Sequence, residues 1–188
     1  MGAMTASPRA NRGPRAAAGN RAALIAAART LFADKGSGVP MSAIARAAGV
    51  GQGVLYRHFP TRGRLAAAVF EENICAVEAR AADPSTTVDD VLRILVDQVV
   101  ASAAFIMMLD PTGVDDPRVA ETAARLRELL TRKLADPGQR GDIAADVTAD
   151  DIVLVVGMLA GLVSKTAGEV RRAHAERAWA LLYRGLRG

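Results

Sequence analysis

The segment that most constrains the fold is residues 42–59, SAIARAAGVGQGVLYRHF, in which two short helical stretches flank a glycine-containing turn. The first stretch ends at Gly49, and Gly49-Val50-Gly51 predicts a tight turn because glycine adopts backbone conformations that other residues avoid. The second stretch starts at Gln52 and ends before Pro60. Two short helices joined by a turn of this length that contains glycine are typical of a helix-turn-helix.

Helical patterns continue on both sides of this segment. Upstream, apolar residues recur every three or four positions until Asp34-Lys35-Gly36, which predicts a helix over 21–35 with Asn20 as its N-cap. Downstream, Thr61 is placed to cap a helix over 62–81. Because the second helix of a helix-turn-helix enters the major groove of DNA, the N-terminal helices predict a head that binds DNA.

The charge of the chain supports this interpretation. Residues 1–65 hold ten Lys and Arg side chains against one acid, Asp34, although the formal net charge of the whole chain is only +4. The rest of the chain is therefore net acidic. A basic N-terminal third joined to an acidic remainder indicates a module that binds a polyanion, carried by a body that does not.

The rest of the chain alternates helical patterns with Pro and Gly breaks. We expect helices over 88–109, 116–136, 149–166 and 169–186, and no strands. Aromatic residues are only 4% of a chain rich in alanine, and this composition favours helices over strands. Thr148 is placed as the N-cap of the third of these helices, which is apolar almost all round. We therefore expect that helix to be buried on several sides.

Several function classes lack support in the sequence. No run of 18 or more apolar residues is present, so no membrane-spanning helix is indicated. No GxSxG, P-loop or HExxH motif is present, and the two histidines, His58 and His174, are far apart. Cys75 is the only cysteine, which excludes an internal disulfide and a thiolate metal site and fits a reducing cytoplasm. We therefore expect no enzyme activity, no cofactor and no metal.

The stretches ALIAAARTLFADKG and MSAIARAAGVGQGVLYRHFPTRGRLAAAV together resemble the tetracycline-repressor (TetR) family of bacterial one-component regulators. The resemblance covers roughly the first third of the chain. It is specific because the Leu-Phe before the first Gly, the Ile-Ala pair, the Ala-Gly-Val turn and the Leu-Tyr-x-His-Phe motif all occur in order.

The sequence departs from the family pattern at three places. Gly51 stands where a small hydroxyl residue is common, which removes a side chain that can cap the helix or contact phosphate. Arg62 replaces the usual lysine and binds phosphate with a different geometry. Gly63-Arg64 replaces the usual acidic pair, so the capping box is absent from the helix over 62–81.

The resemblance implies an all-α homodimer with an N-terminal three-helix helix-turn-helix head and a C-terminal helical body that binds ligand and dimerises. We expect a mobile basic tail over 1–19, a DNA-binding domain over 20–65 and a regulatory domain over 66–188. The implied function is a cytoplasmic, sequence-specific transcriptional regulator. It would be a repressor that leaves a palindromic operator on double-stranded DNA when a small apolar effector binds, with no membrane partner.

Both the residue types and the resemblance predict where DNA is bound. Ser42 lies at a helix N-terminus, where backbone N–H groups and the helix dipole attract phosphate. The side-chain amide of Gln52 can form two hydrogen bonds with one adenine, and Gly53, which has no side chain, lets the helix approach the bases closely. The resemblance assigns phosphate contacts near the end of the second helix. The candidate DNA contacts are Ser42, Gln52, Gly53, Tyr56, Arg57, His58 and Arg62.

The body yields two further candidate sites. A pocket for an apolar effector is predicted from large apolar side chains, some of them adaptable methionines; plain core packing explains the same residues equally well. These are Phe105, Met108, Leu126, Met158 and Trp179. A dimer interface is predicted on the apolar helix over 149–166, where small residues allow close approach; the alternative is a central helix in a monomer. The interface candidates are Val153, Gly157, Ala160, Gly161 and Ser164.

Other functions stay open at this stage. Within the same fold, the protein could be an activator or a regulator that answers no ligand. A helical enzyme or carrier with a basic tail requires a catalytic constellation, and the motifs supply none. A nonspecific nucleoid protein would bind any duplex with the same salt dependence and no sequence preference.

Overall fold

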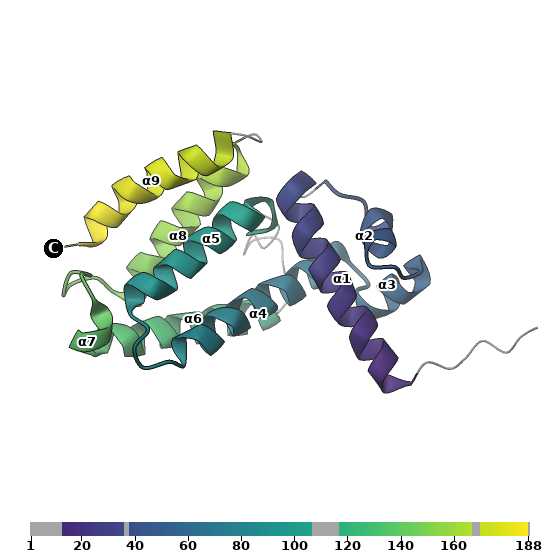
Figure 1. The fold of residues 1–188 in the computed structure, drawn as a ribbon, viewed down its shortest axis with the longest axis horizontal. Helices are drawn as coiled ribbons and strands as arrows, with labels where there is room; N and C mark the ends of the chain where they lie inside the picture. Colours follow the sequence, from purple (N-terminus) through teal and green to yellow (C-terminus); the bar gives the residue numbers. More distant parts are fainter. Residues whose placement is uncertain (1–12, 36–37, 107–116, 167–169, 188) are drawn as a thin grey trace, which may run out of the picture.

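Nine helices make up most of the residues that the structure describes, 13–35, 38–106, 117–166 and 170–187 of a computed structural model (Figure 1). They are α1 (Pro14–Lys35), α2 (Met41–Ala47), α3 (Gln52–His58), α4 (Arg62–Ala81), α5 (Val88–Ile106), α6 (Pro117–Ala135), α7 (Pro137–Arg140), α8 (Ala149–Ser164) and α9 (Arg171–Leu186). Within these ranges, extended pairing is limited to an isolated antiparallel bridge between Ile143 and Arg187. The predicted all-α fold is confirmed. Of these helices, none is long and apolar enough to cross a membrane.

Helices α1, α2 and α3 form a head together with the first half of α4 (Figure 1). Their apolar side chains meet in one core, in which Phe32, Ile44 and Leu55 have no exposed surface. Between α2 and α3, Gly49 has a φ of 67°, in the left-handed region that favours glycine. The helix-turn-helix therefore forms at the residues that the sequence predicts.

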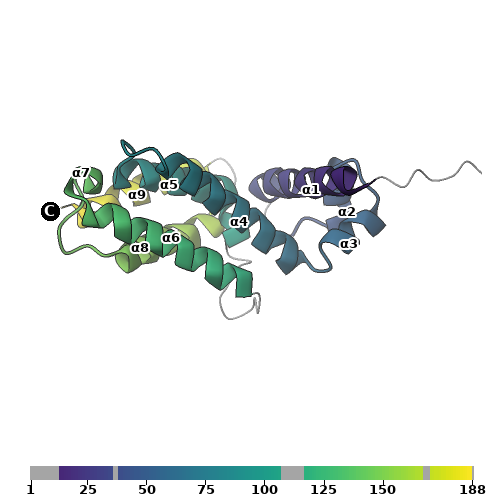
Figure 2. The ribbon, with the colours of Figure 1, turned by 90° about the horizontal axis from the view of Figure 1, so that it is seen from below.

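Helix α4 belongs to two cores, and its observed bounds are the predicted 62–81. Leu65 and Val69 pack in the core of the head, whereas Ile74 and Val77 pack in the core of the body. Phe70 contacts both cores. Figure 2 shows α4 leaving the head and continuing into the body as one helix. The boundary expected at residue 65 therefore falls inside a continuous helix, and head and body share an element.

In the body, α5 and α6 pack against the second half of α4, α8 packs against α5 and α6, and α9 packs against α8 and α5 (Figure 1). Leu92 of α5, Leu130 of α6 and Ile152 of α8 are among its largest fully buried side chains. The short helix α7 is absent from the sequence-based prediction, which places only a break there. Asp136 caps α7, because its Oδ1 accepts a hydrogen bond of 2.8 Å from the N–H of Gly138.

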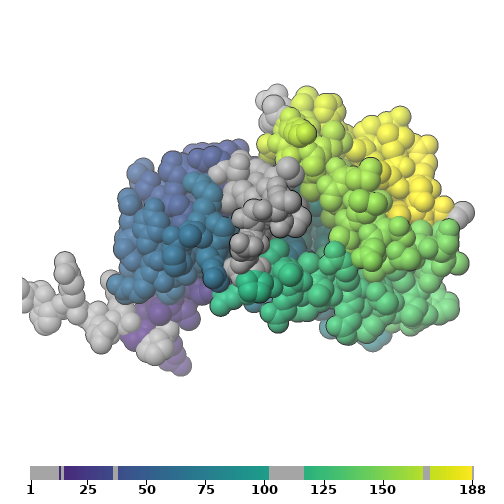
Figure 3. All heavy atoms as spheres, turned by 180° about the vertical axis from the view of Figure 1, so that it is seen from behind, coloured from purple at the N-terminus to yellow at the C-terminus, as the bar shows by residue number. Residues whose placement is uncertain are grey.

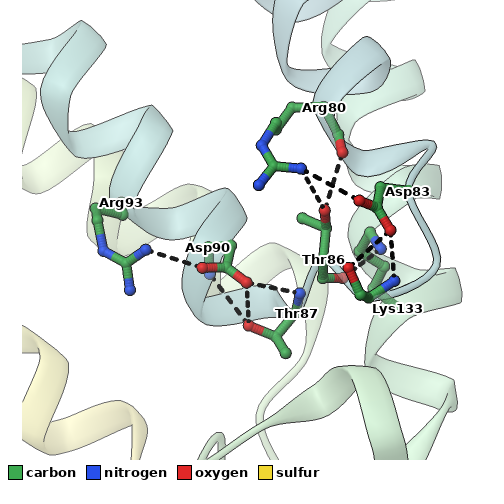
Figure 4. Close-up of polar contacts among 8 residues, drawn as sticks. Arg80, Asp83, Thr86, Thr87, Asp90, Arg93 and Lys133 are labelled. Carbon is green, nitrogen blue, oxygen red and sulfur yellow. Dashed lines mark hydrogen bonds and ion pairs between the residues drawn. The ribbon is translucent and has the colours of Figure 1, made fainter.

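The turn between α4 and α5 is held by a buried lysine (Figure 4). Lys133 of α6 is 4% exposed, and its Nζ donates to the carbonyl of Thr86 at 2.7 Å and to Oε1 of Gln139 at 3.0 Å. The Thr86 hydroxyl donates in turn to the carbonyl of Arg80 at the end of α4. The carbonyl and amide partners satisfy the buried ammonium group, so α6 fixes the path of the chain into α5.

Two helices of the body begin with a capping box, in which a threonine and an acid three residues later bond each other's backbone N–H groups. At α5 these are Thr87 and Asp90, with Arg93 also donating to the carboxylate (Figure 4). The Thr87 N–H and the Arg93 guanidinium lower the pKa of Asp90 to about 2. At α8 they are Thr148 and Asp151, which confirms the predicted N-cap.

Helix α1 begins earlier than the sequence suggests. It starts at Pro14 instead of residue 21, so residues 14–19 belong to a helix and not to a tail, and Asn20 lies inside the helix instead of capping it. Proline is favoured in the first turn of a helix, and the alanines that follow have the highest helix propensity. The carbonyl of Gly13 accepts hydrogen bonds from the N–H groups of Ala16 and Ala17.

Two polar contacts tie the head to the body. Arg29 of α1 forms an ion pair of 2.8 Å with Glu72 of α4. Arg171, the first residue of α9, donates from Nη1 to the carbonyl of Ala33 at 3.1 Å, near the C-terminus of α1. A cation in that place satisfies one of the carbonyls that have no partner within the helix. The orientation of the head is therefore set by the packing of α1 against α4 and α5, together with these polar contacts to α4 and α9.

Candidate nucleic-acid interface and effector cavity

The turn between α2 and α3 is fixed by backbone hydrogen bonds. The N–H of Gly49 donates to the carbonyl of Arg46, and the N–H of Val50 donates to the carbonyl of Ala45, both at 3.0 Å. Gly51 is the N-cap of α3 and has no side chain to cap it. The departure from the family pattern at Gly51 thus leaves the first turn of α3 without a side-chain acceptor, so its N–H groups remain for another partner.

Helix α3 presents one buried side and one exposed side. Leu55 and, after the helix, Phe59 are buried in the head. Gln52, Gly53 and Arg57 are exposed, and Tyr56 is 48% exposed. That exposure argues against a role for the Tyr56 ring in completing the head core. Apart from its chain neighbours and the backbone of its own helix, no described residue comes within 4 Å of the place where a Cβ on Gly53 would be, so packing does not require glycine there.

The other candidate contacts lie near helix starts or near α3. Ser42 is the second residue of α2, whose N-cap, Pro40, offers no side-chain hydrogen bond. Arg62 is the first residue of α4, directly after the N-cap Thr61, which accepts from the N–H of Arg64 at 3.2 Å. His58 ends α3 and is half-buried. The sequence-predicted residues are therefore all at the surface or half-buried on the head.

A basic hollow lies beside the end of α3 and contains residues that the sequence analysis did not single out. It is lined by Arg21 of α1, Arg57 and His58 of α3, Arg64 and Glu71 of α4, and Arg118 of α6, among others. One carboxylate among these groups leaves the hollow net positive. Figure 3 shows the first turns of α6, in green, next to the blue head on this face of the molecule. No sequence pattern marks Arg118 as part of this site, because it lies far from the head residues in the sequence.

A second, apolar cavity of about 180 Å³ lies inside the body. Its walls come from α4, α5, α6 and α8, and its only polar side chains are Asn73 and Gln98. Of the predicted pocket residues, Leu126 lines it. Trp179 is half-buried and stacks near Tyr183, with ring centroids 5.4 Å apart, but does not line the cavity. Met158 is 54% exposed and also lies outside the lining.

The remaining pocket candidates cannot be placed. Met108 lies outside the described residues, and the side chain of Phe105 is outside them as well. Two interface candidates, Val153 and Gly157, line the cavity instead. No group of three or more His, Cys, Asp or Glu that could hold a metal ion occurs in the described part of the chain.

Helices α8 and α9 leave apolar side chains uncovered. Leu154, Met158 and Leu162 of α8 are 45–62% exposed, and Leu181 of α9 is 52% exposed. The sequence predicts that α8 is buried on several sides. In the structure, the other described helices of the chain cover only part of α8, so these apolar side chains stay exposed. Figure 3 shows α8 in yellow-green and α9 in yellow on the surface.

The interface candidates on α8 occupy different positions relative to this apolar surface. Ala160 is buried in its own chain, at 1% exposed. Gly161 and Ser164 are half-buried. No side chain of the described chain comes within 4 Å of the place where a Cβ on Gly161 would be. The space over Gly161 is therefore open to another molecule.

Comparison with known proteins places this arrangement among regulators. The family described as bacterial regulatory proteins, tetR family, matches residues 24–69. A TetR transcription regulatory protein from Mycobacterium vanbaalenii is similar at 29% identity and a TM-score of 0.63, over 93% of this chain and 98% of the other. A TetR transcriptional regulator from Streptomyces coelicolor is similar at 27% identity and a TM-score of 0.62, over 89% and 98%.

A more distant likeness extends to a protein described as a secondary repressor of a multidrug efflux pump. This is NalD from Pseudomonas aeruginosa, at 19% identity and a TM-score of 0.54, over 92% of this chain and 98% of the other. At that identity the likeness concerns the fold alone. Among curated proteins, none matches the sequence.

Proposed function

The chain belongs to the TetR family of bacterial transcriptional regulators, and we propose that it is a repressor that binds a palindromic operator as a homodimer and leaves it when a small apolar effector binds. Proteins of this family are regulators and not enzymes. The observation that carries the proposal is the exposed side of α3, which a buried core holds in place beside a net positive hollow.

We assign the DNA contacts from position and chemistry. Gln52 and Gly53 begin α3, where side chains reach base edges in the major groove, and a glutamine amide pairs with adenine. The other contacts are to phosphate, which attracts cations and the N-terminal ends of helices. The phosphate contacts are Ser42, Tyr56, Arg57, His58 and Arg62, joined by the arginines of the basic hollow.

Dimerisation uses the uncovered faces of α8 and α9. Leu154, Met158 and Leu162 repeat every four residues and so form one stripe along α8, and Leu181 adds to it from α9. Exposed apolar patches of this kind mark interaction surfaces. The space over Gly161 lets the equivalent helix of the partner approach closely. A two-fold dimer then presents two copies of α3 to the two halves of a palindrome.

The effector site is the apolar cavity of the body. Phe70, Asn73 and Ile74 of α4 form part of its wall, so a ligand there touches the helix that also packs in the head. A ligand changes operator affinity only if it binds the DNA-bound and the free conformations with different affinity. Coupling free energies of about 1–3 kcal/mol correspond to about 5–150-fold changes in affinity.

Selection of bound duplexes from a random DNA pool, using the full-length protein, tests this proposal. A two-fold dimer selects inverted repeats whose half-sites are about 34–36 Å apart, or a multiple of that distance. Recovery of single asymmetric sites, or of no preferred sequence, would overturn it. A promoter carrying the selected site in front of a reporter then tests the direction of control. Expression falls in the presence of a repressor and rises in the presence of an activator.

A further inference from the structure

We propose that Arg171 anchors the head to the dimer face, the uncovered apolar stripe of α8 and α9, and thereby sets which separation of operator half-sites the protein accepts. The inference rests on the proposed function for the dimer and the palindromic operator. It goes further because it names a positioning residue in the last helix of the chain, far from the helix-turn-helix, that governs the choice of operator. Three features carry it: the hydrogen bonds of Arg171, its place in its own helix and the elements that it joins.

The guanidinium of Arg171 bonds to carbonyls near the C-terminal ends of two other helices. Its Nη1 donates to the carbonyl of Ala33 in the last turn of α1 at 3.1 Å, and its Nε donates to the carbonyl of Thr166, just after α8, at 3.2 Å. The last carbonyls of a helix have no partner within it and form the negative end of its dipole. One cation therefore joins two helix ends, through hydrogen bonds whose donor is charged and which are stronger than neutral ones.

The place of Arg171 in its own helix argues for a role outside that helix. It is the first residue of α9, where the helix dipole disfavours a cation, and the N-cap, Val170, offers no side-chain hydrogen bond. The next residue, Arg172, is exposed and pairs with Glu176 of the same helix at 2.9 Å. Arg171 is instead half-buried and reaches α1. A cation at this position is therefore stabilised by its partners outside α9 and not by α9 itself.

Arg171 joins elements that have different tasks. Figure 1 shows the start of α9 next to the C-terminal end of α1. Helices α8 and α9 carry the exposed side chains of the dimer face, such as Leu162 and Leu181, whereas α1 contributes to the core of the head. The contact therefore leads from the dimer face to the head without passing through α4, the helix that the proposed effector touches.

In a two-fold dimer, the angle between α1 and the dimer face fixes the distance between the two copies of α3. One base pair added between the half-sites moves them apart by about 3.4 Å and rotates them by about 35°. A head held at both α4 and α9 follows this change only if one of these contacts breaks. A head released from α9 pivots more freely and loses more orientational freedom when it binds. The anchor therefore makes binding tighter at one spacing and weaker at the others.

Pulsed EPR of the full-length protein without DNA tests the anchor itself. Spin labels are placed at two exposed positions, Ala22→Cys on α1 and Arg177→Cys on α9, in a Cys75→Ser background. Labelled chains are diluted with unlabelled protein, so that only distances within one chain are measured. We expect one narrow distance distribution, which becomes about twofold broader in Arg171→Gln because the end of α1 is released, and which is unchanged in the matched control Arg172→Gln. Equal widths in the three proteins would overturn the anchor.

Titration of operators that differ only in the number of base pairs between the half-sites tests the effect on recognition. The unmodified protein and Arg172→Gln should bind the selected spacing about tenfold more tightly than the same site changed by one base pair, the scale of a hydrogen bond from a charged group. In Arg171→Gln this preference should fall to about twofold, mainly through weaker binding at the selected spacing. Arg171→Lys keeps the charge without the fork that reaches two carbonyls and should keep part of the preference. A full preference in both Arg171 variants, or an equal loss of affinity at every spacing, contradicts the proposal.

The two experiments separate this inference from the proposed function. If the distance distribution broadens in Arg171→Gln but selection from random DNA yields no inverted repeat, the anchor stands, and the palindromic operator fails together with the spacing preference that depends on it. If inverted repeats are selected and Arg171→Gln matches the unmodified protein in both experiments, the proposed function stands and the inference fails.

Discussion

The head and the body of this protein differ in how completely the chain fills and covers them. In the head, the core side chains from α1, α2, α3 and α4 leave almost no exposed surface, and among the described residues Tyr56 is its only exposed large hydrophobic side chain. In the body, the core encloses an apolar cavity, and α8 keeps a stripe of large apolar side chains on its surface. The described head leaves no such cavity or apolar stripe, whereas the body has an unfilled cavity and an uncovered apolar face.

The difference shows which part of the molecule responds to its surroundings. A closely packed core has one arrangement and transmits displacement as a rigid unit. A core with a cavity and an uncovered face gains stability when either is occupied, because anything that binds the folded state stabilises it. We therefore expect signals to enter through the body and the head to move as a unit.

The largest expected effect is on the free energy of unfolding, when a leucine is replaced by alanine in each of the two cores. Leu24→Ala removes a side chain with no exposed surface from the head and should lower the free energy of unfolding by about 4 kcal/mol, toward the upper end for such changes. Leu126→Ala removes a cavity-lining side chain that already lacks neighbours on one side, so its cost should be about 2 kcal/mol. Denaturant unfolding measures both. Equal costs would remove the contrast between the cores.

Next in size is the effect of closing the space over Gly161. Gly161→Arg inserts bulk and an unpaired charge into the proposed apolar interface, and the dimer dissociation constant should rise about 100-fold or more. Analytical ultracentrifugation or light scattering measures it. Ala124→Arg adds the same side chain to an exposed position of α6 and should leave the dimer intact. A Gly161→Arg protein that remains dimeric and folded would place the interface elsewhere.

Two substitutions in the head separate base contacts from phosphate contacts. Gln52→Ala should reduce discrimination between the operator and altered sites by about 1–3 kcal/mol while random DNA is bound as before. Arg62→Ala should weaken binding to all duplexes and lower the salt dependence by about one unit of slope. Titrations on specific and random DNA at several salt concentrations measure both. If the two variants lose affinity in the same proportion on both DNAs, the assignment of roles is wrong.

The smallest effect concerns a cap in the body and depends on pH. Asp90→Asn keeps the shape of the capping box at α5 and removes the charge, which should cost about 0.5–1 kcal/mol at pH 7. The pKa of Asp90 in the folded protein is about 2, below the ordinary value of an aspartate, so the stabilisation is complete above the unfolded pKa and is lost progressively as pH falls from about 4 through the folded pKa. Urea unfolding across this range measures it, and a difference between the two proteins that is as large at pH 2 as at pH 7 would contradict the prediction.

Local patterns in the sequence predict the head well. Gly49, the Pro60 break and the Thr61 cap mark the helix ends directly, so the helix-turn-helix and the bounds of α4 follow from the chain alone. The start of α1 at Pro14 escapes prediction because the alanines before Asn20 have no apolar period, although their helix propensity is high. The Thr148 cap is recognised for the same reason as the Thr61 cap, because each threonine stands at the start of a segment whose apolar residues recur at helical spacing.

The cavity and the interface are harder to predict because they arise from packing between helices that are distant in the sequence. Leu126, one of the candidates for the effector pocket, lines the cavity. Met158 has the same apolar character but lies on the outer side of α8, and periodicity cannot distinguish the two sides of a helix that is apolar all round. Arg118 carries no local signal, because its significance comes from the arginines of the head that the fold brings beside it.

The unbroken course of α4 through both cores has a mechanical consequence. Its 20 residues form a rod of roughly 30 Å. If the body end of such a rod tilts by about 5°, its far end moves by roughly 2.6 Å, close to the separation of about 3.4 Å between successive nucleotides of a strand. In a two-fold dimer both heads move, in opposite directions, so the change in their separation is doubled. A small distortion of the cavity wall is then enough to put two copies of α3 out of step with the DNA helix.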